Sequence, residues 1–165
     1  MSDSPRVRPA QPDDVEELMS LIEEFAGFER LEGVLGINTE KLGEVLFSDS
    51  SYCRSIVVEH MDELIGYSFF YPIFRTFSGK RCLYLEDLFI KPDHRGKGLG
   101  RELLLGVTEF ALGNGFERVD FQVLDWNDRA VAFYSGLGAT RVSGNLDFSI
   151  SEQALKNLVN EKARS

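Results

Sequence analysis

The sequence predicts a mixed α+β fold in which a central, mostly antiparallel and twisted sheet carries helices on both faces. In the middle of the chain, segments rich in Ile, Val, Tyr and Phe are separated only by turn-type residues, which is typical of an antiparallel meander. From residue 94 onward helical and strand patterns alternate, which adds crossover connections to the same sheet. Because 165 residues are enough to bury one core, we expect a single domain over residues 1–165.

The N-terminal part is predicted to form one short strand and two helices. The strand covers residues 7–10, and the helical pattern of residues 11–30 has acidic residues in its first turn. A second helix is expected over residues 38–47, with Asn38 or Thr39 as its N-cap. The buried face of the first helix is predicted to consist of Val15, Leu18, Met19, Ile22 and Phe25.

Residues 54–74 and 80–90 are predicted to form three antiparallel strands, with turns at the sequences MDE and FSGK. In a regular strand, side chains alternate between the two faces. One face of the third strand should therefore carry Glu86, together with Tyr84, Leu88 and Ile90. Asp87 should point the other way, with Leu83, Leu85 and Phe89.

The C-terminal half is predicted to alternate helices with strands. The helix over 101–114 should bury Leu103, Leu104, Val107, Phe110 and Ala111, and it ends at the sequence GNG. Asn127 and Ser151 are the expected N-caps of the next two helices. The remaining expected elements are a strand over 117–124, a helix over 126–139, a strand over 148–150 and a helix over 151–163.

Composition excludes several classes of function. The net charge of −9 argues against binding to a phosphate backbone and is compatible with a cationic substrate. No apolar run is as long as a membrane span, and the N-terminus lacks the apolar stretch of a signal peptide. The residues Cys53, Cys82, His60 and His94 are isolated in sequence, which argues against a metal site or a disulfide framework. We therefore expect no metal, no nucleic-acid or membrane partner, and a reducing, cytoplasmic location.

Three glycines, Gly96, Gly98 and Gly100, stand directly before the helical pattern that starts at residue 101. The spacing fits neither a Walker A loop nor a dinucleotide-binding fingerprint. What remains is Arg95-x-x-Gly98-x-Gly100, a loop whose backbone N–H groups and helix N-terminus suit a pyrophosphate. A glycine-rich turn with exposed basic side chains is the equally compatible alternative.

The order of three motifs carries a family resemblance. LYLEDLFIKPDHRGKGLG is followed by a helix, a strand and VLDWNDRAVAFYSGLGA, which resembles the Gcn5-related N-acetyltransferase (GNAT) superfamily over nearly the whole chain. The sequence looks most similar to the diamine acetyltransferase branch. Within it, VLDWN followed by RA looks more like the thialysine N-acetyltransferases than the spermidine/spermine enzymes. The resemblance implies acetyl-CoA as co-substrate, a small-molecule amine as acceptor, and a homodimer.

The resemblance also implies two catalytic residues. Glu86 matches the glutamate that helps to bind the substrate amine and to relay its proton, whereas a solvated or structurally paired acid is the alternative reading. Asp87 is the second choice for this role. Tyr134 matches the tyrosine that acts as general acid to the leaving thiolate, although a tyrosine after a phenylalanine on such a helix is often a core residue.

Further positions match binding segments of the family. A strand segment whose backbone pairs with the pantetheine arm matches Leu88, Phe89 and Ile90, and we expect a bulge there. The predicted pyrophosphate loop is Arg95, Gly96, Lys97, Gly98, Leu99, Gly100 and Arg101. A further cofactor contact matches Asn127, Asp128, Arg129 and Ala130.

Phe28 and Glu29 match a substrate contact, and an aromatic ring beside a carboxylate suits a cation. An ordinary helix end with surface acids is the alternative. The sequence TRVSGNLDF lacks the acidic stretch of the polyamine enzymes, which favours a smaller acceptor such as thialysine or a related lysine-like amino acid. Spermidine/spermine or another diamine remains the alternative acceptor, and a non-catalytic acyl-CoA-binding module is the alternative from another class.

Overall fold

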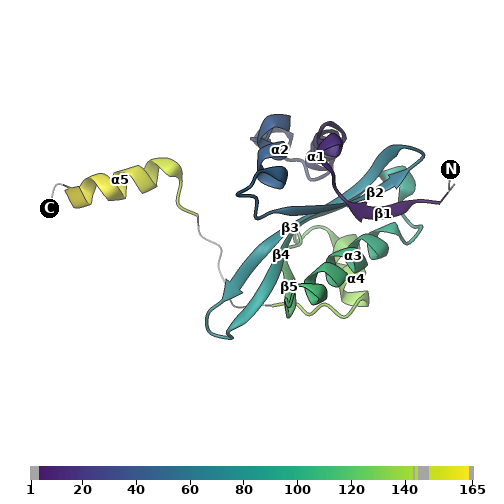
Figure 1. Cartoon of the computed structure of the whole chain (residues 1–165). Coiled ribbons are helices and arrows are strands. Elements are labelled where there is room, and N and C mark those ends of the chain that lie inside the picture. The colour runs from purple at the N-terminus through teal and green to yellow at the C-terminus, as the bar shows by residue number, and fades with distance from the viewer. Residues whose placement is uncertain (1–3, 143, 145–148, 164–165) are drawn as a thin grey trace. The chain divides into compact units, whose positions relative to one another are not determined.

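The computed structural model describes residues 4–142, 144 and 149–163 (Figure 1). It divides into two compact units, residues 1–122 and 123–165, and each is described by itself.

The first unit is built on a five-stranded sheet with the order β1-β2-β3-β4-β5. Its first four strands are antiparallel neighbours, and β5 runs parallel to β4. Met61 and Asp62, both with positive φ, form the tight turn between β2 and β3. The mostly antiparallel sheet predicted from the sequence is confirmed. The strands are β1 (Arg6–Pro9), β2 (Arg54–His60), β3 (Glu63–Arg75), β4 (Lys80–Ile90) and β5 (Arg118–Phe121).

Helices cover both faces of this sheet, as predicted (Figure 1). One face carries α1 (Val15–Phe28) and α2 (Thr39–Phe47), and the other carries α3 (Leu99–Gly113). The Asn38 side chain accepts a hydrogen bond from the Lys41 N–H, which confirms Asn38 as the N-cap of α2. Short 3₁₀ turns are η1 (Pro12–Asp14), η2 (Glu32–Val34) and η3 (Pro92–His94).

Each face has its own apolar core. On the first face, Leu18 and Leu21 of α1 pack with Val57, Tyr67 and Phe89 of the sheet. The predicted buried face of α1 is confirmed, and Leu21, which was not among the predicted residues, is buried as well. The second core lies between α3 and the sheet and contains Leu83, Leu85, Ile90, Leu103, Val107 and Ala111.

Gly66 of β3 allows β3 and β4 to approach closely where β4 ends. A Cβ atom at this position would clash with Ile90 Cδ1 and lie 2.8 Å from the Phe89 carbonyl oxygen. Only glycine fits here without a shift of β4.

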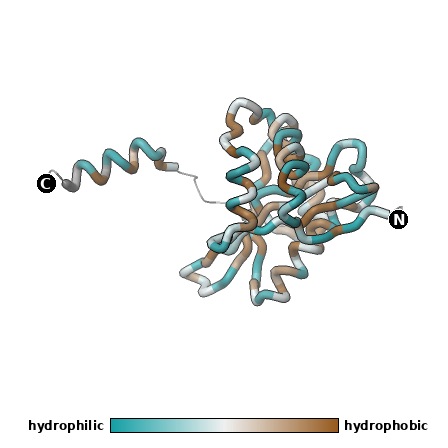
Figure 2. The backbone as a smooth tube through the Cα atoms, turned by 45° about the horizontal axis from the view of Figure 1, so that its top comes forward, coloured by the Kyte–Doolittle hydropathy of each residue, from teal (hydrophilic) through white to brown (hydrophobic). Residues whose placement is uncertain are grey.

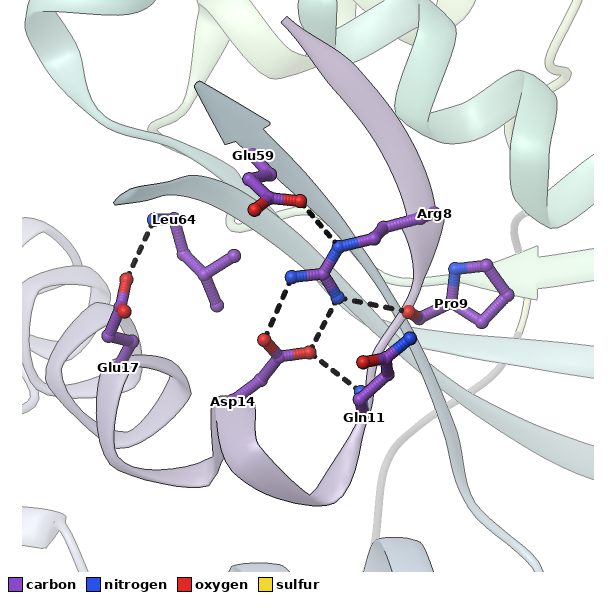
Figure 3. A network of polar contacts seen from close by, with 7 residues as sticks. All are labelled: Arg8, Pro9, Gln11, Asp14, Glu17, Glu59 and Leu64. Carbon is purple, nitrogen blue, oxygen red and sulfur yellow. Dashed lines mark hydrogen bonds and ion pairs between the residues drawn. The ribbon is translucent and has the colours of Figure 1, made fainter. Parts of the chain in front are cut away.

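Arg8 joins the first strand to the start of α1 (Figure 3). Its two terminal nitrogens donate to the Asp14 carboxylate at 2.7 and 2.9 Å, and its Nε donates to Glu59 at 2.6 Å. Asp14 also accepts from the backbone N–H of Gln11 at 2.6 Å. Burial by itself would raise the pKa of Asp14, but the hydrogen bonds from Arg8 and Gln11 outweigh it, so its pKa lies below the ordinary value.

The second unit contains α4 (Asp128–Gly136) and α5 (Glu152–Ala163). The predicted caps are confirmed: Asn127 accepts from the Ala130 N–H, and Ser151 accepts from the Ala154 N–H. Polar and apolar residues alternate along α5 (Figure 2). Among the described residues of this unit none is buried.

Two predicted strands differ from the structure. The strand expected over 117–124 covers only β5, which ends at Phe121, the residue paired with Leu85 of β4. Pairing stops there because β4 is irregular directly after Leu85, as described below. The strand expected over 148–150 includes Phe148, which lies outside the described residues, and Ser149 and Ile150 are not in a strand.

Candidate active site

A β-bulge interrupts β4 at Glu86. Phe69 of β3 pairs with Asp87 and the next residue, Phe70, pairs with Leu85, so Glu86 is an extra residue without a partner in β3. The regular alternation predicted from the sequence is therefore wrong. Leu85 and Ile90 belong to the α3 core, whereas Phe89 belongs to the core under α1.

The bulge brings Glu86 and Asp87 to the α1 side of the sheet, contrary to the prediction that they point apart. The Tyr71 hydroxyl donates to Glu86 at 3.0 Å, and the Tyr67 hydroxyl donates to Asp87 at 3.1 Å. Both tyrosines belong to β3 and pack in or against the α1-side core. Burial, followed by the hydrogen bond to Glu86, raises the pKa of Tyr71 above its ordinary value.

Asp87 is the more perturbed of the two carboxylates. Burial raises the pKa of Asp87 to about 7 against the opposing effect of the Tyr67 hydrogen bond, and the charges of Glu86 and Glu29 add to the rise. The pKa of Glu29 is also raised, by burial. An acid that titrates near neutral pH at such a site is a candidate functional group.

A cavity of about 250 Å³ lies next to Asp87. Among the side chains that the structure describes, its polar lining consists of Glu29, Tyr67 and Asp87, and the other lining residues are Gly36 and apolar side chains of α1 and of Leu31, Val34, Leu35 and Ile37. None of the described residues that line it carries a positive charge. The cavity can hold an ammonium group near two carboxylates while its apolar parts contact an alkyl chain. Glu86 is exposed and does not line this cavity.

The structure separates the two predicted substrate contacts. Glu29 lines the cavity, but Phe28 does not. The centroid of the Phe28 ring lies 4.5 Å from the guanidinium carbon of Arg95. That guanidinium also lies 5.4 Å from the Phe89 ring, and its Nε donates to the Ile90 carbonyl at 2.8 Å. Arg95 thus anchors the start of the glycine loop to the end of β4 and to α1.

The glycine loop has the backbone that the sequence predicts. Gly96 and Gly98 have φ angles of 77° and 82°, a conformation that favours glycine, and a Cβ at either position would meet no atom within 4 Å. The loop leads directly into α3 at Leu99, and Gly98 is the N-cap of this fifteen-residue helix. This is the geometry expected of a pyrophosphate cradle. The exposed residues around it include Lys97 and Arg101.

The backbone of Leu88, Phe89 and Ile90 pairs with β3 on one side only. Because β5 ends opposite Leu85, no strand among the described residues pairs with the other edge of this segment. The bulge expected within this segment lies instead at Glu86, two residues before Leu88, and Leu88, Phe89 and Ile90 pair regularly with β3. An extended group can form backbone hydrogen bonds along this open edge.

The remaining predicted residues lie in the second unit, on or directly before α4. Asn127 is engaged as the N-cap, followed by Asp128, Arg129 and Ala130. Tyr134 is half-buried, and its ring centroid lies 5.0 Å from that of Phe133.

Sequence reasoning missed Tyr67 and Tyr71 as partners of the carboxylates, and it missed the cavity-lining residues of 31–37. The tyrosines are four residues apart in an aromatic-rich strand, and nothing in that pattern distinguishes them from core residues. Residues 31–37 have no periodicity that indicates which side chains line a cavity.

The chain matches the acetyltransferase (GNAT) family over residues 16–139, which include the bulged strand, the glycine loop and α4. It belongs to that family. It is thus an N-acetyltransferase, an enzyme class that uses acetyl-CoA as co-substrate. Within the described residues, no group of three or more His, Cys, Asp or Glu side chains could hold a metal, and no described helix is long and apolar enough to cross a membrane.

Relatives of this GNAT chain include thialysine N-epsilon-acetyltransferases. The one from Mus musculus is 34% identical over 166 residues, which cover 94% of this chain and 97% of the relative. A spermidine/spermine N(1)-acetyltransferase-like protein 1 from Homo sapiens is 26% identical, covering 84% of this chain and 21% of the relative.

Solved structures agree with the fold. An integron cassette protein from V. cholerae superposes with a TM-score of 0.78 at 20% identity, covering 96% of this chain and 99% of that chain. An aminoglycoside acetyltransferase from an uncultured soil metagenomic sample, in complex with sisomicin, gives a TM-score of 0.75 at 20% identity, covering 89% and 95%. The GNAT fold expected from the resemblance is thereby confirmed.

Proposed function

We propose that this N-acetyltransferase moves an acetyl group from acetyl-CoA to the primary amine of thialysine or a related lysine-like amino acid. The observation that carries the proposal is the cavity lined by Glu29, Tyr67 and Asp87 beside the bulge of β4. Relatives named for thialysine over almost their full length support this choice of acceptor.

In this proposal the cavity receives the substrate ammonium, with Glu29 and Asp87 as its counter-charges. An alkylammonium has a pKa of about 10 and must lose a proton before its nitrogen can attack. Glu86 assists this deprotonation, because it is exposed at the bulge next to Asp87 and is held there by Tyr71. Asp87 is the second candidate for the same task. Phe28, the other matched substrate contact, lies outside the cavity and packs against Arg95, so in this proposal it supports the end of α1 beside the acceptor site.

Acetyl-CoA supplies a thioester-activated acetyl group, and three segments are proposed to bind it. The open edge of Leu88, Phe89 and Ile90 offers backbone groups to the pantetheine arm. The loop with Arg95, Gly96, Lys97, Gly98, Leu99, Gly100 and Arg101 offers N–H donors and positive charge to the pyrophosphate. The third contact comes from Asn127, Asp128, Arg129 and Ala130. The Tyr134 hydroxyl gives its proton to the leaving thiolate sulfur.

The whole chain, residues 1–165, is proposed to act as one acetyltransferase domain, and the family match across both units supports this. By resemblance to its branch, the enzyme is proposed to be a cytoplasmic homodimer. A mass measurement in solution that gives the monomer would reject the dimer.

A diamine such as spermidine is the second candidate acceptor, since the cavity holds two carboxylates and one relative is named for spermidine and spermine. The test is release of CoA thiol from acetyl-CoA with thialysine, lysine, putrescine, spermidine and a blank without amine. Preference for thialysine supports the proposal, and preference for spermidine replaces the acceptor. Acetyl-CoA binding without thiol release on any amine would instead indicate a non-catalytic acyl-CoA-binding module.

A further inference from the structure

The side chain of Arg95 connects the glycine loop to the residues next to the acids of the cavity. Its Nε donates to the Ile90 carbonyl at 2.8 Å, and its guanidinium carbon lies 4.5 Å from the centroid of the Phe28 ring and 5.4 Å from that of Phe89. At both distances a cation is attracted to an aromatic face. Phe28 directly precedes Glu29 at the end of α1, and Phe89 and Ile90 are the last two residues of β4. One side chain of the loop thus contacts both α1 and β4.

The end of α1 that carries Glu29 has a costly backbone conformation. Glu29 is the C-cap of the helix, and the next residue, Arg30, has a φ of 61°. The Leu31 N–H donates to the Ala26 carbonyl at 2.8 Å and the Arg30 N–H to the Gly27 carbonyl at 3.1 Å, which is the Schellman pattern. Glycine is the residue that adopts this left-handed conformation without strain, and here an arginine adopts it. Contacts with the rest of the protein are therefore needed to hold this helix end in place.

Arg95 does not act as the counter-charge of Glu29. A paired guanidinium would lower the pKa of a carboxyl group, whereas the pKa of Glu29 is raised, by burial. The guanidinium lies over aromatic rings, which bind a cation by their faces and leave the carboxylate of Glu29 to an ammonium in the cavity. The effect of Arg95 on Glu29 is thus one of position.

We infer that Arg95 is a positioning residue for the amine acceptor: by contacting Phe28 it fixes the end of α1, and with it the carboxylate of Glu29 in the cavity. The inference rests on the proposed function and deepens it, because it gives a residue of the proposed acetyl-CoA loop a role in acceptor binding. Since Arg95 belongs to the loop and contacts α1, it also fixes the acceptor site relative to the cofactor site.

The first test compares Arg95→Ala with Lys97→Ala, because each variant removes one positive charge from the same loop. Both should weaken the binding of CoA, measured by calorimetry. With thialysine as acceptor and saturating acetyl-CoA, Arg95→Ala should raise the KM for the amine about fivefold or more and change kcat by less than about threefold. Lys97 is exposed, and its variant should act on CoA affinity and not on the amine KM. An unchanged amine KM in Arg95→Ala, or an equal rise in both variants, would overturn the inference.

The second test asks whether Arg95 acts through Glu29. The variant Glu29→Gln removes the carboxylate charge and should itself raise the amine KM about tenfold. In that background Arg95→Ala should raise the KM by less than about twofold more, because the charge that Arg95 positions is already gone. Independent effects that multiply would refute the action through Glu29. A general loss of structure would instead lower kcat in either background.

Phe28→Leu tests the same link from the side of α1, and it covers the case in which Arg95→Ala does not fold. Phe28 is 40% exposed and leucine keeps an apolar side chain there, so folding should be retained. Loss of the ring face should raise the amine KM about two- to fivefold and leave CoA binding as in the wild type. An unchanged amine KM in this variant would refute the link between Arg95 and the acceptor.

The same measurements separate this inference from the proposed function. Wild-type turnover of thialysine, combined with an amine KM that neither Arg95→Ala nor Phe28→Leu changes, refutes the inference and leaves the proposed function intact. Absence of wild-type turnover with thialysine, lysine, putrescine and spermidine refutes the proposed function and this inference with it.

Discussion

Replacing Asp87 with Asn should make the protein more stable at alkaline pH and a weaker binder of its acceptor. The pKa of Asp87 is raised to about 7 from an ordinary value of 3.8, first of all by burial. The folded state therefore holds the Asp87 proton more tightly than the unfolded state does. This contribution to stability is fully present below about pH 4 and is lost as the pH rises through about 7.

The magnitude follows from the shift. About three pH units correspond to an upper limit of about 4 kcal/mol, and because the Asp87 side chain is still partly exposed to water we expect about 2 kcal/mol. Asn does not ionise, and its amide oxygen can still accept the Tyr67 hydroxyl hydrogen bond. The variant should therefore equal the wild type at about pH 4 and exceed it by about 2 kcal/mol at about pH 8.

Urea unfolding followed by circular dichroism at several pH values measures this difference. The exposed Asp49→Asn variant removes one negative charge elsewhere and should show no such pH dependence. In steady-state assays at about pH 8, Asp87→Asn should raise the KM for the amine at least about tenfold, since the ammonium loses a counter-charge. The reasoning is refuted if Asp87→Asn is less stable than wild type at alkaline pH, or if the difference does not change with pH.

Three further variants test other parts of the structure. Arg8→Met leaves the Asp14 carboxylate without its cationic partner and should cost about 3 kcal/mol in urea unfolding at neutral pH, whereas Arg6→Met on the same strand should be nearly neutral. Because the pKa of Asp14 is lowered, the wild-type contribution is lost as the pH falls below about 4, opposite in sign to Asp87. Gly66→Ala should force β3 and β4 apart and lower stability by about 1–3 kcal/mol, and a value within error of wild type would contradict the close approach. Tyr134→Phe should reduce CoA release at least about tenfold, or roughly 1.4 kcal/mol of barrier, with acetyl-CoA binding retained, and unchanged turnover would remove Tyr134 from the mechanism.

The sequence predicts the helices, their caps and the glycine loop because these features depend on local chemistry. Asn38, Asn127 and Ser151 cap helices through bonds to N–H groups three residues away, which a linear pattern can show. Gly96 and Gly98 likewise adopt positive φ angles, which glycine permits without strain.

The bulge at Glu86 could not be predicted in this way. Nothing in the sequence LYLEDLFI marks one of its residues as the extra one. Only the pairing with Phe69 and Phe70 of the neighbouring strand shows that this residue is Glu86. The prediction that Asp87 points away from Glu86 was wrong for this reason. The cavity depends in addition on Tyr67 and on residues 31–37, which come together only in the folded chain.

The bulge has a consequence for how this enzyme can change in evolution. If Glu86 were deleted, Leu85 and Asp87 would keep their partners in β3, and the residues on either side would keep their faces and their cores. The side chain at position 86 is thus not required for the packing of either core. Mutation can alter the group presented there while selection on stability acts on its neighbours, so the enzyme can acquire a different acid–base group without rebuilding its sheet.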